Sequence, residues 1–217
     1  WLAQPPSLNS RFKMSHPLLI SEKHKLCFIH MPKTAGQWTK RFLLKLDVGF
    51  KRVKNTKNFI DIPLASNFNN DYYKFGFVRD PVDWYQSFFN FQSDDFHNRF
   101  LFDRMMVAWD INEYITNIKN VRLTKARMTL MYNYIFSVGH ENECKNIFKY
   151  ENLYDSLLKI LNDKGIDASS LMEKEKTQKR NASKKECREK INQESLDFIY
   201  ESCKGIYEKF NYKRRYV

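Results

Sequence analysis

The sequence predicts an α/β fold in which a parallel sheet is flanked by helices within a single domain. Three apolar, strand-like runs, at residues 25–30, 73–78 and 146–150, are each followed closely by a segment with helical spacing. Strands that alternate with helices are typical of a parallel sheet. The 217 residues suffice for one hydrophobic core and are too few for two comfortable domains. In such a fold, the ligand is expected beyond the carboxyl ends of the strands.

Composition and charge narrow the class of protein. Hydrophobic residues make up 42% of the chain and aromatic residues 16%, which predicts a globular protein and not a disordered one. The formal net charge of +12 favours a polyanionic partner. A nucleic acid, an acidic membrane surface, an acidic glycan and a multiply phosphorylated cofactor all fit, and composition alone does not choose among them.

The four cysteines show no CxxC spacing, so a zinc site is not expected. Cys27 lies in an apolar run, as a buried free thiol would, and we expect a reducing compartment. No apolar run of transmembrane length and no signal peptide is visible, which favours a cytoplasmic location. The chain begins at Trp1, so the alternative is the Golgi lumen, with an N-terminal anchor removed.

The N-terminal quarter of the chain predicts an arm followed by the first strand, loop and helix. Residues 1–21 contain three prolines and are expected to form an irregular arm, so that the domain proper covers residues 22–217. A buried strand is predicted over residues 25–30, a loop over 31–36 and a helix over 37–46.

The second strand and its helix are predicted from the segment around Arg79-Asp80-Pro81. Residues 50–62 are ambiguous and include short strands, and residues 67–71 form an Asn-rich loop. The run at 73–78 is a strand. A helix follows over 81–91, because proline is favoured in a first helical turn and Asp80 can cap it. The remaining expected elements are, in order, helices over 102–120 and 123–136, a strand over 146–150, a helix over 153–161, an exposed basic loop over 174–183, and one or two helices over 184–210.

The segment "HMPKTAGQW", residues 30–38, places a lysine, a hydroxyl and a glycine between a strand and a helix. Successive backbone N–H groups and a helix N-terminus form an anion site there, and Lys33 adds a positive charge. The alternative is an ordinary tight connection in which Gly36 permits the turn. A Walker A loop, GxxxxGK[ST], would need glycines at the positions of Cys27 and Pro32, so an ordinary P-loop ATPase is disfavoured.

A second pair of candidate residues is Arg79 and Ser87, eight residues apart in "RDPVDWYQS". An arginine at a strand end and a serine two turns into the next helix can bind one anion. The alternative is a salt bridge from Arg79 to Asp83 with a solvated serine.

These two motifs carry a resemblance to a known family. "FIHMPKTAGQW" resembles the 5′-phosphosulfate loop of the sulfotransferases that use 3′-phosphoadenosine 5′-phosphosulfate (PAPS), in particular the carbohydrate sulfotransferases with their HxPKTAG signature. "FGFVRDPVDWYQSFF" resembles that family's 3′-phosphate segment. The motifs stand in the right order, each at a strand-to-helix turn, and the resemblance spans residues 25–212. It implies the P-loop-like sulfotransferase fold.

The resemblance implies transfer of a sulfuryl group from PAPS to a hydroxyl acceptor by in-line displacement, with PAP as the second product and no metal. Lys33 would act as a catalytic residue, stabilising charge on the bridging oxygen or donating a proton. The family's donor-binding positions correspond here to Lys33, Thr34, Ala35, Gly36, Gln37, Trp38, Arg79, Ser87, Lys179, Arg180, Asn181 and Ser183. For the last four, a solvated basic run is the alternative, and for Trp38 it is anchoring of the helix in the core.

The acceptor side departs from the family pattern. A general base for the attacking hydroxyl is most often histidine, but Asp61 stands in "FIDIPLAS" where related enzymes carry one. Asp61 and His97 are the candidate bases, and His30 is a third for which a structural role is the simpler interpretation. Trp84 occupies a position where the family often has a second arginine, and it either shapes the acceptor entrance or packs.

Three other functions remain open from the sequence. One is a P-loop-like nucleotide kinase that uses ATP and magnesium. Another is a non-catalytic module that binds polyanions or nucleic acids, and a third is a sulfotransferase-like protein that has lost its base. The leading prediction is a sulfotransferase whose acceptor is a carbohydrate hydroxyl, with no nucleic acid partner and no stable membrane insertion.

Overall fold

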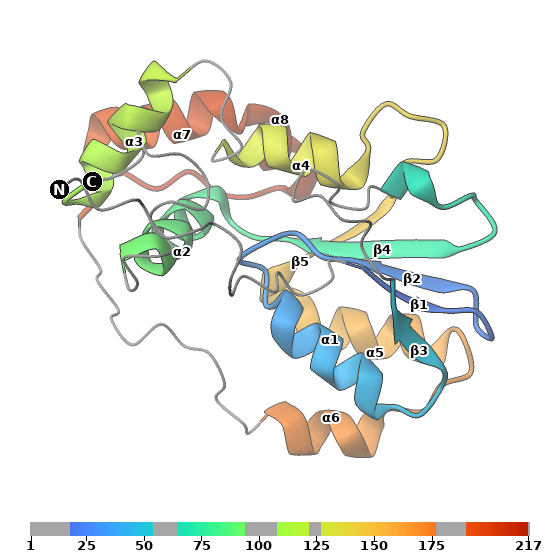
Figure 1. Ribbon diagram of the computed structural model, residues 1–217. Helices are drawn as coiled ribbons and strands as arrows, with labels where there is room; N and C mark the ends of the chain where they lie inside the picture. The colour runs from blue at the N-terminus through green and yellow to red at the C-terminus, as the bar shows by residue number, and fades with distance from the viewer. Residues whose placement is uncertain (1–17, 54–64, 94–107, 122–126, 177–189, 217) are drawn as a thin grey trace, which may run out of the picture.

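A computed structural model describes residues 18–53, 65–93, 108–121, 127–176 and 190–216, drawn as the coloured ribbon in Figure 1. It confirms the predicted α/β class. One five-stranded sheet lies between two layers of helices (Figure 1).

The sheet combines a parallel part with an antiparallel edge. Its strands are β1 (Leu18–Ser21), β2 (Leu26–Ile29), β3 (Phe50–Arg52), β4 (Tyr73–Val78) and β5 (Asn146–Lys149), in the spatial order β3-β1-β2-β4-β5. β2, β4 and β5 run parallel to one another, and these are the three strands that the sequence predicts. β1 is antiparallel to both of its neighbours. The carboxyl ends of β2, β4 and β5 therefore meet at one edge.

The prediction of an irregular arm over residues 1–21 is wrong at its C-terminal end. Residues 18–21 form β1, all four of them buried, and pair with β2 from Leu18 opposite Ile29 to Ser21 opposite Leu26. Four residues directly after a proline are too short a run to stand out by periodicity. In the predicted short strands of residues 50–62, β3 confirms the first three residues, and residues 54–64 lie outside the described part.

One face of the sheet is covered by α1 (Gly36–Lys45), α5 (Leu153–Asn162) and α6 (Ser169–Lys176) (Figure 1). The first two confirm predictions. α6 was not expected, and Lys174–Lys176, predicted to begin an exposed basic loop, form its last turn. Met172 and Glu175 are buried there, and Glu175 forms an ion pair with Lys45 of α1, which docks the helix onto the layer.

The other face is covered by α2 (Pro81–Ser93), α3 (Ile111–Asn120), α4 (Met128–Phe136), α7 (Gln193–Ser202) and α8 (Lys204–Phe210) (Figure 1). These helices confirm the predictions over their own residues. The predicted ranges also included residues 108–110, 127 and 190–192, which are described and are not helical. No helix in the described segments is long and apolar enough to cross a membrane.

Alternate residues of the strands contribute to two separate hydrophobic cores, one on each face of the sheet. Cys27 and Ile29 point into the core with α2, α4 and α7, whereas Phe28 packs with Phe75 and Phe77 under α1 and α5. At the centre of β4, a Cβ on Gly76 would lie 2.4 Å from the Phe136 ring. Glycine here lets α4 pack closely against the strand that leads to Arg79.

Candidate active site

The loop between β2 and α1, residues 30–35, contains two residues with left-handed backbone conformation. Lys33 has φ 67° and Ala35 has φ 54°, a conformation that costs a non-glycine residue about 1–2 kcal/mol. Thr34 is buried, and its hydroxyl donates to the Met31 carbonyl oxygen at 2.7 Å, so it braces the loop from inside. Alternation of this kind turns successive N–H groups towards one side, as in anion-binding nests.

Helix α1 begins at this loop, and no side chain of the described residues caps its N-terminus. Ala35 is the N-cap residue and offers no side-chain acceptor, and no acidic residue lies in the first turn. The first N–H groups of a helix have no intrahelical acceptor and carry partial positive charge. An anion such as a phosphate would satisfy them.

Gly36 is required by the packing of the protein itself. A Cβ at this position would lie 1.6 Å from Cδ2 of His30, so the imidazole occupies the place of a side chain. Nδ1 of His30 lies 3.4 Å from Nζ of Lys40. Burial, with the charges of Lys40 and Lys33, lowers the pKa of His30 to about 3. His30 is therefore a weak base, and its packing supports the structural interpretation.

Trp84 ties the loop to helix α2. Its indole Nε1 donates to the Pro32 carbonyl oxygen at 2.9 Å, and the side chain is fully buried, stacked on Phe88 with ring centroids 4.8 Å apart. Of the two roles predicted for Trp84, packing is the one observed, with a hydrogen bond in addition. The indole of Trp84 connects the two predicted phosphate motifs.

Lys33 also reaches helix α2. Its Nζ lies 4.4 Å from the centroid of the Phe91 ring, a cation–π distance. Trp84, Ser87 and Phe91 are spaced by three and four residues and so share one face of α2. Because Trp84 and Phe91 both meet the loop, Ser87 lies on the face of α2 that is turned to it.

Arg79 follows β4 directly and carries a buried donor that no described residue accepts from. Its guanidinium carbon lies 5.0 Å from the Tyr150 ring centroid, and its Nε is buried with no hydrogen-bond partner among the described residues. The predicted alternative, a salt bridge from Arg79 to Asp83, is not formed between these two described residues. Asp83 is bound by Arg215 instead, at 2.8 and 3.0 Å. A buried unsatisfied donor is costly unless a ligand completes it.

Comparison with known proteins identifies the family. The family model described as the sulfotransferase family matches residues 16–213, nearly the whole chain. The chain belongs to the sulfotransferase family. It is a PAPS-dependent sulfotransferase, since enzymes of this family take the sulfuryl group from PAPS and release PAP. Searches of curated proteins and of solved structures gave no significant match.

The structure of this sulfotransferase places some of the predicted site residues away from the loop surface. Trp38 is nearly buried and stacks on Phe42, with centroids 5.1 Å apart, and meets Tyr154 edge-on at 5.0 Å. These contacts favour the anchoring role. Gln37 is exposed at the start of α1. The remaining predicted residues lie outside the described part of the chain and stay predictions: Asp61, His97, Lys179, Arg180, Asn181 and Ser183.

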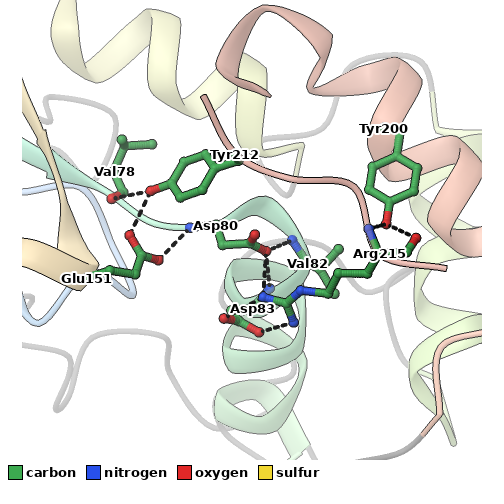
Figure 2. Close-up of polar contacts among 8 residues, drawn as sticks. All are labelled: Val78, Asp80, Val82, Asp83, Glu151, Tyr200, Tyr212 and Arg215. Atoms are coloured by element: carbon green, nitrogen blue, oxygen red, sulfur yellow. Dashed lines mark hydrogen bonds and ion pairs between the residues drawn. The ribbon is translucent and has the colours of Figure 1, made fainter. Parts of the chain in front are cut away.

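Three residues of the sulfotransferase that the sequence interpretation did not assign surround the β4–α2 turn (Figure 2). Glu151 accepts a hydrogen bond from the backbone N–H of Asp80 at 2.9 Å, and its other oxygen lies 2.8 Å from the Tyr212 hydroxyl. Arg215 binds the carboxylates of Asp83 and Asp80. Glu151 lies in "FKYENL" and Tyr212 in "IYEKFNY", two segments that resemble the family, but nothing in either segment indicates what its residues contact.

Proposed function

We propose that this sulfotransferase transfers the sulfuryl group of PAPS to a hydroxyl of a carbohydrate by direct in-line displacement, without a metal ion. The observation that carries the donor side is the hydrogen bond from Trp84 to Pro32. It joins the loop with its uncapped helix N-terminus to the helix that follows Arg79, so that two anion-binding elements lie at one edge of the sheet.

The two ends of the donor are bound by different parts of this edge. The backbone N–H groups of residues 34–38 bind the 5′-phosphate at the start of α1. Arg79, whose buried Nε has no acceptor among the described residues, binds the 3′-phosphate together with Ser87. This division distinguishes PAPS from nucleotides that have no 3′-phosphate.

Lys33 has the catalytic role in this proposal. When PAPS is bound, the bond between sulfur and the bridging phosphate oxygen is the one that breaks, and negative charge develops on that oxygen. A lysine ammonium beside it stabilises this charge, or supplies a proton to it. The contact with Phe91 orients Nζ without neutralising its charge.

On the acceptor side, Asp61 or His97 takes the proton of the attacking hydroxyl. His30 is the weaker candidate because its lowered pKa leaves little proton affinity at neutral pH. The carbohydrate acceptor is supported by the HxPKTAG-type loop, and the net charge of +12 suits an acidic or sulfated glycan.

The donor is tested by calorimetric titration with PAP, adenosine 5′-phosphosulfate, ADP and ATP, each with magnesium and with EDTA. We expect PAP to bind equally well in EDTA and more tightly than the other three nucleotides. Binding of ATP alone, and only with magnesium, would favour the nucleotide kinase. Salt-dependent binding to DNA or heparin, with neither nucleotide binding nor turnover, would favour the polyanion-binding module.

The acceptor is tested by transfer of radiolabelled sulfuryl groups from PAPS to a panel of hydroxyl compounds. The panel includes sulfated glycans, the same glycans after chemical desulfation, neutral oligosaccharides, and simple phenols and alcohols. We expect product on at least one glycan and none on the simple alcohols. Sulfation of phenols or alcohols with no glycan product would refute the carbohydrate assignment and leave the donor assignment intact.

A further inference from the structure

Arg215 binds both carboxylates of the turn that presents Arg79 (Figure 2). Nη1 lies 2.8 Å and Nη2 3.0 Å from the two carboxylate oxygens of Asp83, and Nη2 lies 3.3 Å from Oδ1 of Asp80. Two parallel N–H···O bonds of this kind are the strongest geometry for an arginine and a carboxylate. Asp80 is almost completely buried and Asp83 about two-thirds buried, whereas the Arg215 side chain is about half exposed, so solvent screens these ion pairs in part.

The segment that carries Arg215 is itself held in place. The hydroxyl of Tyr200 in α7 accepts from the backbone N–H of Arg215 and donates to its carbonyl oxygen. Three residues earlier, the hydroxyl of Tyr212 lies 2.8 Å from Glu151 and 3.2 Å from the carbonyl oxygen of Val78. Hydrogen bonds therefore hold both ends of the segment 212–215, and this positions the guanidinium of Arg215 at the turn (Figure 2).

The position of Asp83 makes it a competitor for Arg79. Asp83 stands four residues after Arg79 and in the first turn of α2. Burial raises the pKa of its carboxyl group, but the hydrogen bond and charge of Arg215, and then the charge of Arg79, lower it, and the net pKa is lowered. Yet Asp83 is bound by Arg215 at both oxygens, and the Nε of Arg79 has no acceptor in the described structure. Without Arg215, Asp83 would be an anion close to Arg79 with no other cationic side chain bound to it among the described residues.

We propose that Arg215 is a specificity-determining residue for the nucleotide: by binding Asp83 and Asp80, it keeps Arg79 available for the 3′-phosphate. An unpaired Asp83 would lower 3′-phosphate affinity in two ways, because it would pair with Arg79 and would repel the incoming dianion. Arg215 acts through Arg79 and Asp83 and not by touching the phosphate. The inference rests on the proposed assignment of Arg79 to the 3′-phosphate.

The test is a double-mutant cycle with Arg215→Gln, Asp83→Asn and the double variant. The dissociation constants of PAP and of adenosine 5′-monophosphate, which differ only in the 3′-phosphate, are measured for each by calorimetry. We expect Arg215→Gln to lower the preference for PAP about tenfold, mainly by weakening PAP binding. The double variant should regain most of that preference, because the competing carboxylate is gone. Asp83→Asn alone should keep it.

Two further variants control for charge and folding. Arg214→Gln removes the same charge from the neighbouring residue, whose guanidinium lies over the Tyr200 ring, and should leave the preference unchanged. Arg215→Lys keeps the charge without the bidentate geometry and should give an intermediate preference. Thermal unfolding of each variant establishes that it is folded at the titration temperature.

The outcomes separate failure of the inference from failure of the proposed function. Equal weakening of both nucleotides in Arg215→Gln, or no recovery in the double variant, would overturn the role of Arg215 and reduce it to a structural contact. A wild-type protein that binds both nucleotides equally would overturn the 3′-phosphate assignment, and the inference with it.

Discussion

The indole Nε1 of Trp84 donates a hydrogen bond to the carbonyl oxygen of Pro32 at 2.9 Å, across 52 positions of the chain. Pro32 directly precedes Lys33, and Trp84 lies one turn into the helix that follows Arg79. Because the indole is buried and stacked on Phe88, it has little freedom to move. Trp84 thus adds a buried hydrogen bond to the pairing of β2 with β4 and to the Lys33–Phe91 contact, which also hold the two phosphate motifs together.

Replacing this side chain by Trp84→Phe should weaken both folding and donor binding. The change leaves the partly buried Pro32 carbonyl without this donor and removes part of a core ring, so we expect a loss of about 1–3 kcal/mol in the free energy of unfolding. Urea denaturation measures this loss, and PAP titration should show weaker binding. Trp109→Phe, at a residue that is 87% exposed, is the control. Equal stability and equal PAP affinity in the two variants would show that the hydrogen bond from Trp84 to Pro32 does not position the donor site.

Gly36→Ala should disturb the loop because its Cβ would lie 1.6 Å from the His30 ring. Overpacking of this kind costs about 1–3 kcal/mol and would displace either the imidazole or the start of α1. Adding His30→Ala should restore part of the stability. Gly205→Ala in α8, where no atom lies within 4 Å of the new Cβ, serves as control and should be neutral or stabilising. Chemical denaturation of the wild type, Gly36→Ala, the double variant with His30→Ala, and Gly205→Ala measures these changes in stability. Equal stability of Gly36→Ala and Gly205→Ala would contradict the predicted clash.

Lys33→Ala should reduce kcat by about 10²–10³-fold, since it removes the charge that stabilises the leaving oxygen. The variant should stay folded. Lys33→Gly should be equally inactive but more stable than Lys33→Ala by about 1 kcal/mol, because glycine adopts φ 67° without a steric penalty. Single-turnover transfer assays and unfolding curves measure the two effects separately. Normal turnover in either variant would exclude Lys33 as a catalytic residue.

The folded protein should lose stability on acidification through His30. Burial, together with Lys40 and Lys33, lowers the pKa of its imidazole to about 3 from its usual 6.5. Between these values the unfolded chain binds a proton that the folded protein excludes. The contribution of His30 is therefore complete above pH 6.5 and is lost towards pH 3, at up to about 1.4 kcal/mol per pH unit.

This pH dependence is measured by denaturation of wild-type protein and His30→Gln from pH 4 to pH 7. The variant should show a smaller slope, because glutamine does not titrate. His140→Gln, a change at an exposed histidine, controls for removal of an imidazole elsewhere. Identical slopes for wild type and His30→Gln would show that the acid sensitivity arises elsewhere.

Most of the fold follows from short stretches of sequence. β2 and β4 are fully or almost fully buried, and, like β5, each leads into a helix, so local apolar runs were enough to predict them. β1 was missed because four residues after Pro17 have no period to detect. α6 was missed because its apolar stripe is only Met172, which is buried, and Leu171, which is partly buried against the same core.

The site was predictable only where its residues are neighbours in the chain. The loop around Lys33 and the pair Arg79 and Ser87 are short motifs, each at a strand-to-helix turn. The hydrogen bond from Trp84 to Pro32 and the ion pair of Arg215 with Asp83 join residues 52 and 132 positions apart, and no local pattern indicates either. Long-range polar contacts depend on how the layers pack, which periodicity does not describe.

Arg79→Met should separate the effect of Arg79 on the free energy of unfolding from its effect on PAP binding. The Nε of Arg79 is buried with no acceptor in the described part of the chain, and methionine can fill much of the same space with no donor to satisfy. The loss of the contact with Tyr150 costs about 0.5–1 kcal/mol and offsets part of this gain, so the free energy of unfolding without ligand should change by less than about 1 kcal/mol.

Arg79→Met should change PAP affinity strongly, although it changes the free energy of unfolding little. A hydrogen bond to a charged partner contributes about 1.5–3 kcal/mol, so Arg79→Met should weaken PAP binding by about 10–100-fold and adenosine 5′-monophosphate binding hardly at all. Arg41→Met, at an exposed arginine of α1, removes the same charge and should leave both affinities near wild type. A large loss of stability with an unchanged preference for PAP would mean that Arg79 supports the fold and that another residue binds the 3′-phosphate. Retained stability with a lost preference would show that the unsatisfied donor of Arg79 is kept for the ligand.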